Sequence, residues 1–285
     1  MLTYIMDGKK LSENIKNKLI FDVNNLIKNG NRAPVLAIIL VGNKYSSISY
    51  IKSNKKYCNE IGFIMIVYYF PYDILDINIL NLLNQLNFSR FIDAILIQMP
   101  LPFKINNKII CEHITPHKDV DCINPFNIGK LFFKCPFFIP CTQKAIFSLL
   151  HFYNIRIFGL NALVLGESNI VGKPISLKLL LSGCNVTIAN IYNMNLKFLI
   201  KRSDLLIVAL GKAKFLHGSY IKKGSIVIDV GINKLFDGRL VGDVDYESSL
   251  QNASYITPVP GGIGPMTVAS LMQNTLKAYK YNNYF

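Results

Sequence analysis

The sequence lacks the patterns that mark zinc-binding, secreted and membrane-spanning proteins. Its six cysteines include no Cys-x-x-Cys pair, and its four histidines show no ligand spacing. The longest uncharged run, 179–196, contains a glycine and four asparagines, so it is typical of a helix end, a turn and a strand. Charged residues among the first 13 interrupt any signal-peptide core. We expect a soluble cytoplasmic protein with reduced cysteines, no metal and no membrane partner.

Acidic residues are also scarce, with 17 Asp and Glu against 31 Lys and Arg, which gives a net charge of +14. The basic residues are scattered, and they form no arginine-rich stripe or dense block of the kind that binds nucleic acid. We therefore expect no nucleic-acid partner. A basic surface of this kind attracts anionic small molecules, including phosphates and polyglutamate tails.

The 285 residues, 51% of them hydrophobic, suffice for two α/β domains with separate cores. Apolar runs of strand length alternate with helical patterns, which predicts parallel sheets covered by helices. Strands are expected at 34–41, 63–70, 92–98, 161–165, 185–190, 204–210, 225–230 and near Tyr255. Helices are expected at 11–26, 45–61, 74–86, 142–153, 175–181 and 266–279. The segment 116–140, rich in Pro, Asn and Gly, is predicted to be an irregular crossing between domains.

The strand 161–165 leads directly into a glycine loop and then a helix. Gly166 permits a tight turn, Ser168 replaces the usual second glycine, and Gly172 lies one residue later than the usual third glycine. Backbone N–H groups at such a helix start bind phosphate. The loop predicts a dinucleotide-binding unit over about 160–260, with a ligand-free strand–helix turn as the alternative.

Four further segments accompany this loop: 98–102 (Gln-Met-Pro-Leu-Pro), 117–121 (His-Lys-Asp-Val-Asp), 227–233 (Val-Ile-Asp-Val-Gly-Ile-Asn) and 258–267 (Pro-Val-Pro-Gly-Gly-Ile-Gly-Pro-Met-Thr). Together they resemble, nearly end to end, the bifunctional methylenetetrahydrofolate dehydrogenase/methenyltetrahydrofolate cyclohydrolase family. The resemblance implies an N-terminal α/β folate-binding domain (1–139 plus 268–285) and a Rossmann-type domain (140–267), with the active site in the cleft between them.

The resemblance also implies a reaction and its partners. Members of the family oxidise 5,10-methylenetetrahydrofolate with NADP and then hydrolyse the methenyl product to 10-formyltetrahydrofolate. We therefore expect tetrahydrofolate derivatives as substrates, NADP as cofactor with NAD as an alternative, and a homodimer.

Site residues follow position by position from the same resemblance. The implied catalytic residues are Tyr50, Asn54, Gln98 and Asp121. The implied substrate-binding residues are Ser47, Tyr50, Pro260, Gly261 and Gly262. The implied cofactor-binding residues are Gly166, Glu167, Ser168, Val171, Gly172 and Ile232.

One departure from the family pattern concerns the chemistry itself. The pattern Val-Gly-x4-Ser-x2-Tyr-x3-Lys is present from Val41 to Tyr50, but Asn54 stands where the family has its acid/base lysine. Asparagine forms hydrogen bonds but exchanges no proton near neutral pH. Lys55 and Lys56 point about 100° and 200° away on a helix. We expect hydrolysis to be weak or lost and hydride transfer to be less impaired.

Other departures concern the cofactor and the helix after the crossing segment. Glu167 stands where the family sometimes has Arg, and Asn190 and Ile191 replace polar or basic residues at a strand end, which leaves Lys173 as the nearest base for a 2′-phosphate. Gln143 replaces a proline. These losses keep a second reading open, a catalytically degenerate binding protein on the same scaffold.

Overall fold

The computed structural model describes residues 2–284, and the chain divides into two compact units. The first unit comprises the chain up to Glu13 and residues 142–267, and the second comprises 14–141 and the chain from Val268 onward. The sequence had placed the N-terminal segment with the second unit. It joins the first because the strand β1 (Tyr4–Ile5) pairs in parallel with β11 (Ala253–Ile256), a pairing too short to leave a pattern in the sequence.

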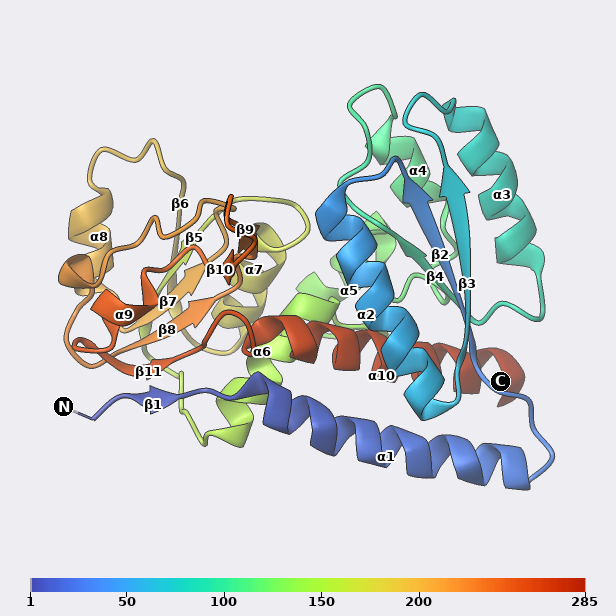
Figure 1. Ribbon diagram of the computed structural model, residues 1–285, viewed down its shortest axis with the longest axis horizontal. Coiled ribbons are helices and arrows are strands. Elements are labelled where there is room, and N and C mark those ends of the chain that lie inside the picture. The colour runs from blue at the N-terminus through green and yellow to red at the C-terminus, as the bar shows by residue number, and fades with distance from the viewer. Residues whose placement is uncertain (1, 285) are drawn as a thin grey trace. The chain divides into compact units, whose positions relative to one another are not determined.

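The first unit is built on a six-stranded sheet in which every neighbouring pair is parallel, in the order β1-β11-β8-β7-β5-β6. The remaining strands are β5 (Asn161–Leu165), β6 (Asn185–Ala189), β7 (Leu205–Val208) and β8 (Ser225–Asp229). The chain runs outward to β6 and then returns to β7 on the other side of β5 (Figure 1). Doubly wound sheets bind ligands beyond the carboxyl ends of the strands at such a reversal.

Short helices connect the strands of the first unit (Figure 1). They are α6 (Cys141–Phe152), α7 (Gly172–Leu181), α8 (Leu196–Arg202), the 3-10 turn η1 (Gly218–Tyr220) and α9 (Tyr246–Ser249). A two-stranded antiparallel ribbon, β9 (Asn233–Lys234) with β10 (Leu240–Val241), follows β8. Sequence reasoning predicted α6 and α7 but missed α8, η1 and α9.

The second unit has a three-stranded parallel sheet in which β2 (Val35–Val41) lies between β3 (Ile64–Phe70) and β4 (Ala94–Ile97). All of β2 is buried, and its side chains alternate between two cores as a strand requires. Leu36, Ile38 and Leu40 pack with residues of α1, α2 and α10. The intervening residues pack on the opposite face with α3. The expectation of strands buried on both faces is therefore confirmed for β2, whereas the edge strand β3 leaves Ile64, Ile66 and Tyr69 exposed.

The helices with most of their residues in this unit are α1 (Gly8–Lys28), α2 (Tyr45–Ile61), α3 (Asp76–Phe88), α4 (Asn107–His113), α5 (Pro125–Phe132) and α10 (Ile263–Tyr284). No helix within residues 2–284 is both long and apolar enough to cross a membrane.

The prediction that 116–140 is irregular throughout was wrong, because α5 lies inside it. The Asn124 side chain accepts a hydrogen bond from the Phe126 N–H at 2.7 Å, and Pro125 occupies the first helical position. Asparagine as N-cap followed by proline is a favoured helix start. The composition that suggested a loop thus includes a helix-starting signal.

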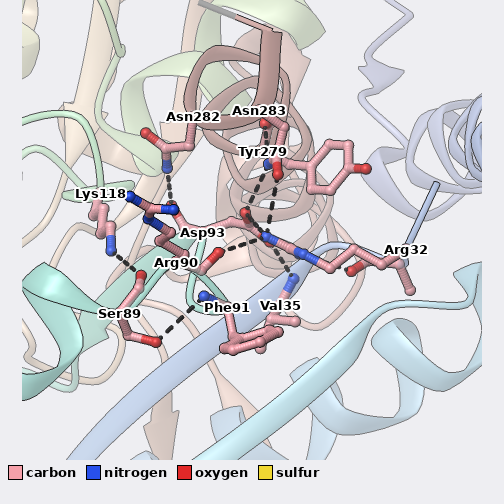
Figure 2. A network of polar contacts seen from close by, with 11 residues as sticks. Arg32, Val35, Ser89, Arg90, Phe91, Asp93, Lys118, Tyr279, Asn282 and Asn283 are labelled. Carbon is pink, nitrogen blue, oxygen red and sulfur yellow. Dashed lines mark hydrogen bonds and ion pairs between the residues drawn. The ribbon is translucent and has the colours of Figure 1, made fainter.

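A buried carboxylate, Asp93, ties the end of α10 to the sheet of the second unit (Figure 2). Arg32 donates one hydrogen bond to each Asp93 oxygen, both at 2.7 Å, and the Val35 N–H donates another at 2.8 Å. The Asn283 amide reaches the same carboxylate at 3.2 Å, and the Asn282 amide reaches the Asp93 carbonyl at 3.1 Å. Three segments distant in sequence, at 32–35, 93 and 282–283, therefore meet at Asp93.

Lys118, also in Figure 2, closes the carboxyl end of α3. Its Nζ donates to the carbonyls of Leu86, Asn87 and Ser89 at 2.7–2.9 Å. Burial lowers the pKa of Lys118, but a cation is favoured at a helix C-terminus, where carbonyls have no helical partner. This lysine therefore positions the segment 117–121.

Replacing Asp93 by Ala should destabilise the protein by about 3–5 kcal/mol, because Arg32 and the Val35 N–H would lose a buried partner. Denaturant unfolding of the variant and the wild type measures the difference. Asp237→Ala is the matched control, since among residues 2–284 that exposed carboxylate bonds only to the nearby Arg239, and its loss should leave stability unchanged. Equal stability of the two variants would contradict the role given to Asp93.

Candidate active site

The first group of expected site residues lies along one face of α2. Ser47, Tyr50 and Asn54 are three and four residues apart, a spacing that places side chains on the same helical face. Ser47 and Asn54 are buried, and Tyr50 is partly buried. The structure therefore brings together the three residues that the sequence pattern grouped.

Asn54 is fully buried, with 0% of its surface exposed. Neither Oδ1 nor Nδ2 has a hydrogen-bond partner among the residues that the structure describes. Asn54 lies close to Tyr50 and lowers the pKa of the Tyr50 phenol, but the two side chains do not reach hydrogen-bond geometry. Burial raises the pKa of Tyr50 well above its usual value, and Cys141 and Asp121 add to the rise. The Tyr50 phenol is thus held protonated beside a neutral amide.

The two lysines that follow Asn54 are exposed. The Lys56 side chain is 80% exposed, and its Nζ lies 3.9 Å from Glu60 Oε1. A register shift of α2 would be needed to turn either lysine to the face of Asn54, and the helix continues unbroken from Tyr45 to Ile61. No lysine of this helix therefore takes the place of the missing one.

Gln98 follows β4 at the carboxyl edge of the three-stranded sheet. Its backbone N–H bonds to the Ile39 carbonyl of β2 at 2.9 Å, and its side-chain Nε2 donates to the Met99 carbonyl at 3.0 Å. The other amide atom, Oε1, is buried without a partner among the described residues. Gln98 therefore presents an unpaired acceptor, as Asn54 presents an unpaired donor and acceptor.

Asp121 accepts a hydrogen bond from the Cys141 N–H at 3.3 Å. Burial raises the pKa of Asp121, while its hydrogen bonds with Cys141 oppose the rise. Asn274 of α10 supports this arrangement from behind, because its amide donates to the carbonyls of Val120 and Ile139 at 2.8 and 2.9 Å. Sequence reasoning missed Asn274, whose partners lie more than 130 residues away.

Asp119 organises the turn that presents Asp121. Its buried carboxylate accepts from the Ile123 N–H at 3.1 Å, the Asn124 N–H at 2.9 Å and the Asn127 amide at 2.8 Å. Burial raises the pKa of Asp119 to about 6, despite these three donors. The motif was visible in the sequence, but Asp119 was not singled out, because a carboxylate that bonds to backbone leaves no spacing signal.

In the first unit, the glycine loop joins β5 to α7. A Cβ on Gly166, whose φ is +122°, would lie 2.3 Å from the Ala209 carbonyl oxygen, and a Cβ on Gly172 would lie 2.1 Å from the Gly166 oxygen. The Ser168 hydroxyl accepts from the N–H groups of Val171 and Gly172 at 3.2 and 3.4 Å. The tight turn leaves the start of α7 free of side-chain bulk, which fits a bound pyrophosphate.

The remaining expected cofactor residues lie on exposed parts of this unit. Glu167 is exposed and accepts a hydrogen bond from the Asn190 amide at 3.3 Å. Ile232, after β8, is 57% exposed.

The loop after β11 contains Pro260, Gly261 and Gly262. The Gly261 carbonyl accepts from the Lys9 N–H at 2.9 Å, and a Cβ on Gly262 would lie 2.6 Å from the Pro258 oxygen. Close packing therefore favours glycine at 262 and a φ of +114° favours it at 261, while Pro260 is exposed.

Two other acidic residues, Asp229 and Asp243, accept hydrogen bonds from backbone N–H groups. Asp229 accepts from the N–H groups of Gly231, Asp243 and Val244, and Asp243 accepts from the N–H groups that follow β7. Burial raises the pKa of Asp229 to about 7. Within the described part of the chain, no cluster of three or more His, Cys, Asp or Glu residues has the arrangement to hold a metal ion.

Two family models match the chain over most of its length. The catalytic domain of tetrahydrofolate dehydrogenase/cyclohydrolase matches residues 6–121, and the NAD(P)-binding domain of the same enzymes matches residues 140–283. The chain belongs to the tetrahydrofolate dehydrogenase/cyclohydrolase family. The resemblance found in the sequence motifs is thereby confirmed.

Solved structures of this family superpose closely on the chain. A bifunctional methylenetetrahydrofolate dehydrogenase/cyclohydrolase from Campylobacter jejuni is 41% identical, with a TM-score of 0.94 over 98% of this chain and 99% of its own. The Trypanosoma brucei enzyme, solved with NADP and an inhibitor, is 31% identical, with a TM-score of 0.94 over 99% and 98%. A methylenetetrahydrofolate dehydrogenase from Bombyx mori is 36% identical, with a TM-score of 0.92 over both full chains.

These matches confirm the two-domain α/β fold, the assignment as a methylenetetrahydrofolate dehydrogenase/cyclohydrolase enzyme and the cofactor expectation of NADP with NAD as an alternative.

The raised pKa of Asp119 predicts a pH-dependent loss of stability. Asp119 is neutral when folded below about pH 6 but ionises near 3.8 when unfolded, so its contribution is complete below about pH 4 and is lost as pH rises through 6. The loss should be about 3 kcal/mol. Denaturant unfolding of the wild type and Asp119→Asn at pH 4, 6 and 8 tests this.

The stability of the wild type relative to Asp119→Asn should fall between pH 4 and pH 8, because the variant has no carboxyl at this position. A difference that stays constant over this range would show that Asp119 keeps an ordinary pKa in the folded protein.

Proposed function

We propose that the protein is principally a dehydrogenase, which oxidises 5,10-methylenetetrahydrofolate to the methenyl compound with NADP and hydrolyses that product slowly or not at all. The observation that carries this proposal is Asn54, a fully buried neutral amide at the place of the family's acid/base lysine. The structure supports it further because Lys55 and Lys56 are exposed.

The second unit supplies the folate contacts. In this proposal the Tyr50 ring stacks on or orients the folate ring system, and Asp121 accepts a hydrogen bond from the amino edge of the pterin. Ser47 lies one turn before Tyr50 on the same face. Asn54 and Gln98 meet polar atoms of the substrate with groups that have no partner in the protein. Unpaired buried amides are costly, so a ligand that pairs them binds more strongly.

The first unit supplies the cofactor contacts. The loop from Gly166 to Gly172 holds the pyrophosphate at the start of α7, Ile232 covers an apolar part of the dinucleotide, and Pro260, Gly261 and Gly262 approach the substrate. When bound, the nicotinamide ring accepts the hydride, so the protein must chiefly hold two rings in reacting geometry. Holding the two rings in this geometry does not require the side chain at residue 54 to exchange a proton.

Hydrolysis makes a different demand, because water must attack the methenyl carbon while protons move as the ring opens. Asn54 transfers no proton near neutral pH. Tyr50 is a poor base, since its raised pKa keeps the phenol protonated. The two activities of the family therefore depend on residue 54 to different degrees, and this chain retains the one that depends on it less.

We also propose a cytoplasmic location, a homodimer and a role in one-carbon metabolism, each on the basis of family membership. The competing function is a binding protein without catalysis on the same scaffold. Purified protein that binds folate and NADP but produces no NADPH from methylenetetrahydrofolate would favour that function.

Replacing Asn54 by Lys should raise methenyl hydrolysis about 100-fold or more, because a positioned acid/base group contributes on that order. The dehydrogenase rate should change much less. Two assays on each purified protein, NADPH formation and decay of the methenyl absorbance, separate the steps.

Ser53→Lys is the matched control, since it adds the same charge at an exposed position of the same helix and should leave hydrolysis unchanged. Brisk hydrolysis by the wild-type protein would contradict the proposal.

A further inference from the structure

The carboxylate of Glu167 lies at the carboxyl edge of the first unit's sheet. Strands β5 and β6 are parallel neighbours in the register Leu165 to Ala189, and the Gly166 N–H continues this ladder by donating to the Ala189 carbonyl at 2.9 Å. Residues 167 and 190 therefore leave the sheet side by side. The hydrogen bond from Asn190 Nδ2 to Glu167 Oε1, 3.3 Å long, joins them.

The orientation of the Asn190 amide is fixed by a second contact. Its Oδ1 accepts a hydrogen bond from the Tyr192 N–H at 3.0 Å, so its Nδ2 is the atom that faces Glu167. An amide reversed at this position would place two acceptors together and lose both bonds. Asn190 is therefore a positioning residue, which holds an exposed carboxylate at the end of the second strand.

In doubly wound dinucleotide-binding domains, the end of the second strand meets the adenosine ribose. An acidic side chain there accepts a hydrogen bond from a ribose hydroxyl, whereas an arginine accommodates a 2′-phosphate. The strand end of this chain offers only Asn190 and Ile191, and the sequence alone showed no acid there. The fold supplies one from the neighbouring loop.

No cation neutralises this carboxylate within the described residues. Glu167 forms no ion pair, and the nearest base along the loop, Lys173, donates instead to the Asn169 side chain at 2.8 Å. A phosphate placed beside Glu167 would meet an uncompensated like charge, which is unfavourable at short range.

We propose that Glu167, positioned by Asn190, sets the selectivity of this enzyme between NAD and NADP. The carboxylate accepts a hydrogen bond from a ribose hydroxyl of NAD and repels the 2′-phosphate of NADP. NADP binding is therefore weaker than the site would otherwise permit, and NAD competes with it. This inference rests on the proposed dinucleotide binding by the first unit, and it adds the residue that discriminates between the two forms.

Calorimetry on the full-length protein tests the proposal by binding rather than by turnover. Calorimetry needs no tryptophan fluorescence to report binding, and this chain has no tryptophan. The ligands are NAD, NADP, 5′-AMP and adenosine 2′,5′-bisphosphate, and the variants are Glu167→Gln, Asn190→Ala and the control Glu247→Gln. Glu247 is an exposed acid on α9 of the same unit.

Glu167→Gln should strengthen the binding of NADP and of the bisphosphate by about tenfold or more, with NAD and 5′-AMP unchanged or weaker. Asn190→Ala should shift the ratio in the same direction by a smaller factor, and Glu247→Gln should not shift it. Raising the salt concentration should move the wild-type ratio toward NADP, because salt screens the repulsion, and should move the Glu167→Gln ratio less.

If the NAD-to-NADP affinity ratio of Glu167→Gln stays within twofold of the wild-type ratio, the assignment of Glu167 is overturned, while dinucleotide binding is left intact. Failure of the wild-type protein to bind either dinucleotide would overturn both this assignment and the proposed function. The two failures are thus distinguishable in one set of titrations.

Discussion

The dinucleotide unit depends on a contact between two backbones, where Gly166 passes the Ala209 carbonyl so closely that a Cβ would lie 2.3 Å from its oxygen. This contact lies between β5 and β7, where the strand order reverses. It allows the chain to turn at once into α7 and points Glu167 toward the end of β6. A larger residue at 166 would displace the loop, the start of the helix and the carboxylate together, since all three follow within six residues.

The second unit depends in the same way on buried charged side chains that bond to the backbone. Asp93 joins three segments distant in sequence, Lys118 closes the carboxyl end of α3, and Asp119 holds the turn before α5. None of these groups is among the expected site residues, yet Lys118 and Asp119 fix the segment from which Asp121 extends. Removing one partner of a buried charge is costly. These contacts therefore restrain the segment from which Asp121 extends.

Periodicity was enough to predict the sheets and the long helices, because β2 buries both faces and α2 shows a regular apolar face. It could not find β1, which has two residues, or α5, whose helix start lies in a segment rich in loop-forming residues. Motifs named Tyr50, Gln98 and Asp121 as expected site residues. They could not show what supports those residues, because Asn274 acts over more than 130 positions of sequence.

The motifs named Glu167 as an expected cofactor-binding residue, but they could not place its carboxylate beside the end of β6. The residues at the end of β6 are Asn190 and Ile191, and neither is acidic. The acid, Glu167, belongs to the loop after β5 and lies beside Asn190 because β5 and β6 are paired in parallel. Register is a property of paired strands, so a single segment does not contain it.

Asn54 and Gln143 are both fully buried, both leave their amide atoms without partners among residues 2–284, and both stand where the sequence departs from the family pattern. Each unpaired buried group costs about 1–3 kcal/mol. A chain that had lost all function would gain stability by replacing such an amide with an apolar side chain of similar size. At position 54 the amide also retains the ability to hydrogen-bond a substrate, while the proton exchange that hydrolysis requires is gone. Asn54 therefore offers hydrogen bonds that can orient a substrate but no group that exchanges a proton near neutral pH, and hydrolysis depends on such a group more than hydride transfer does.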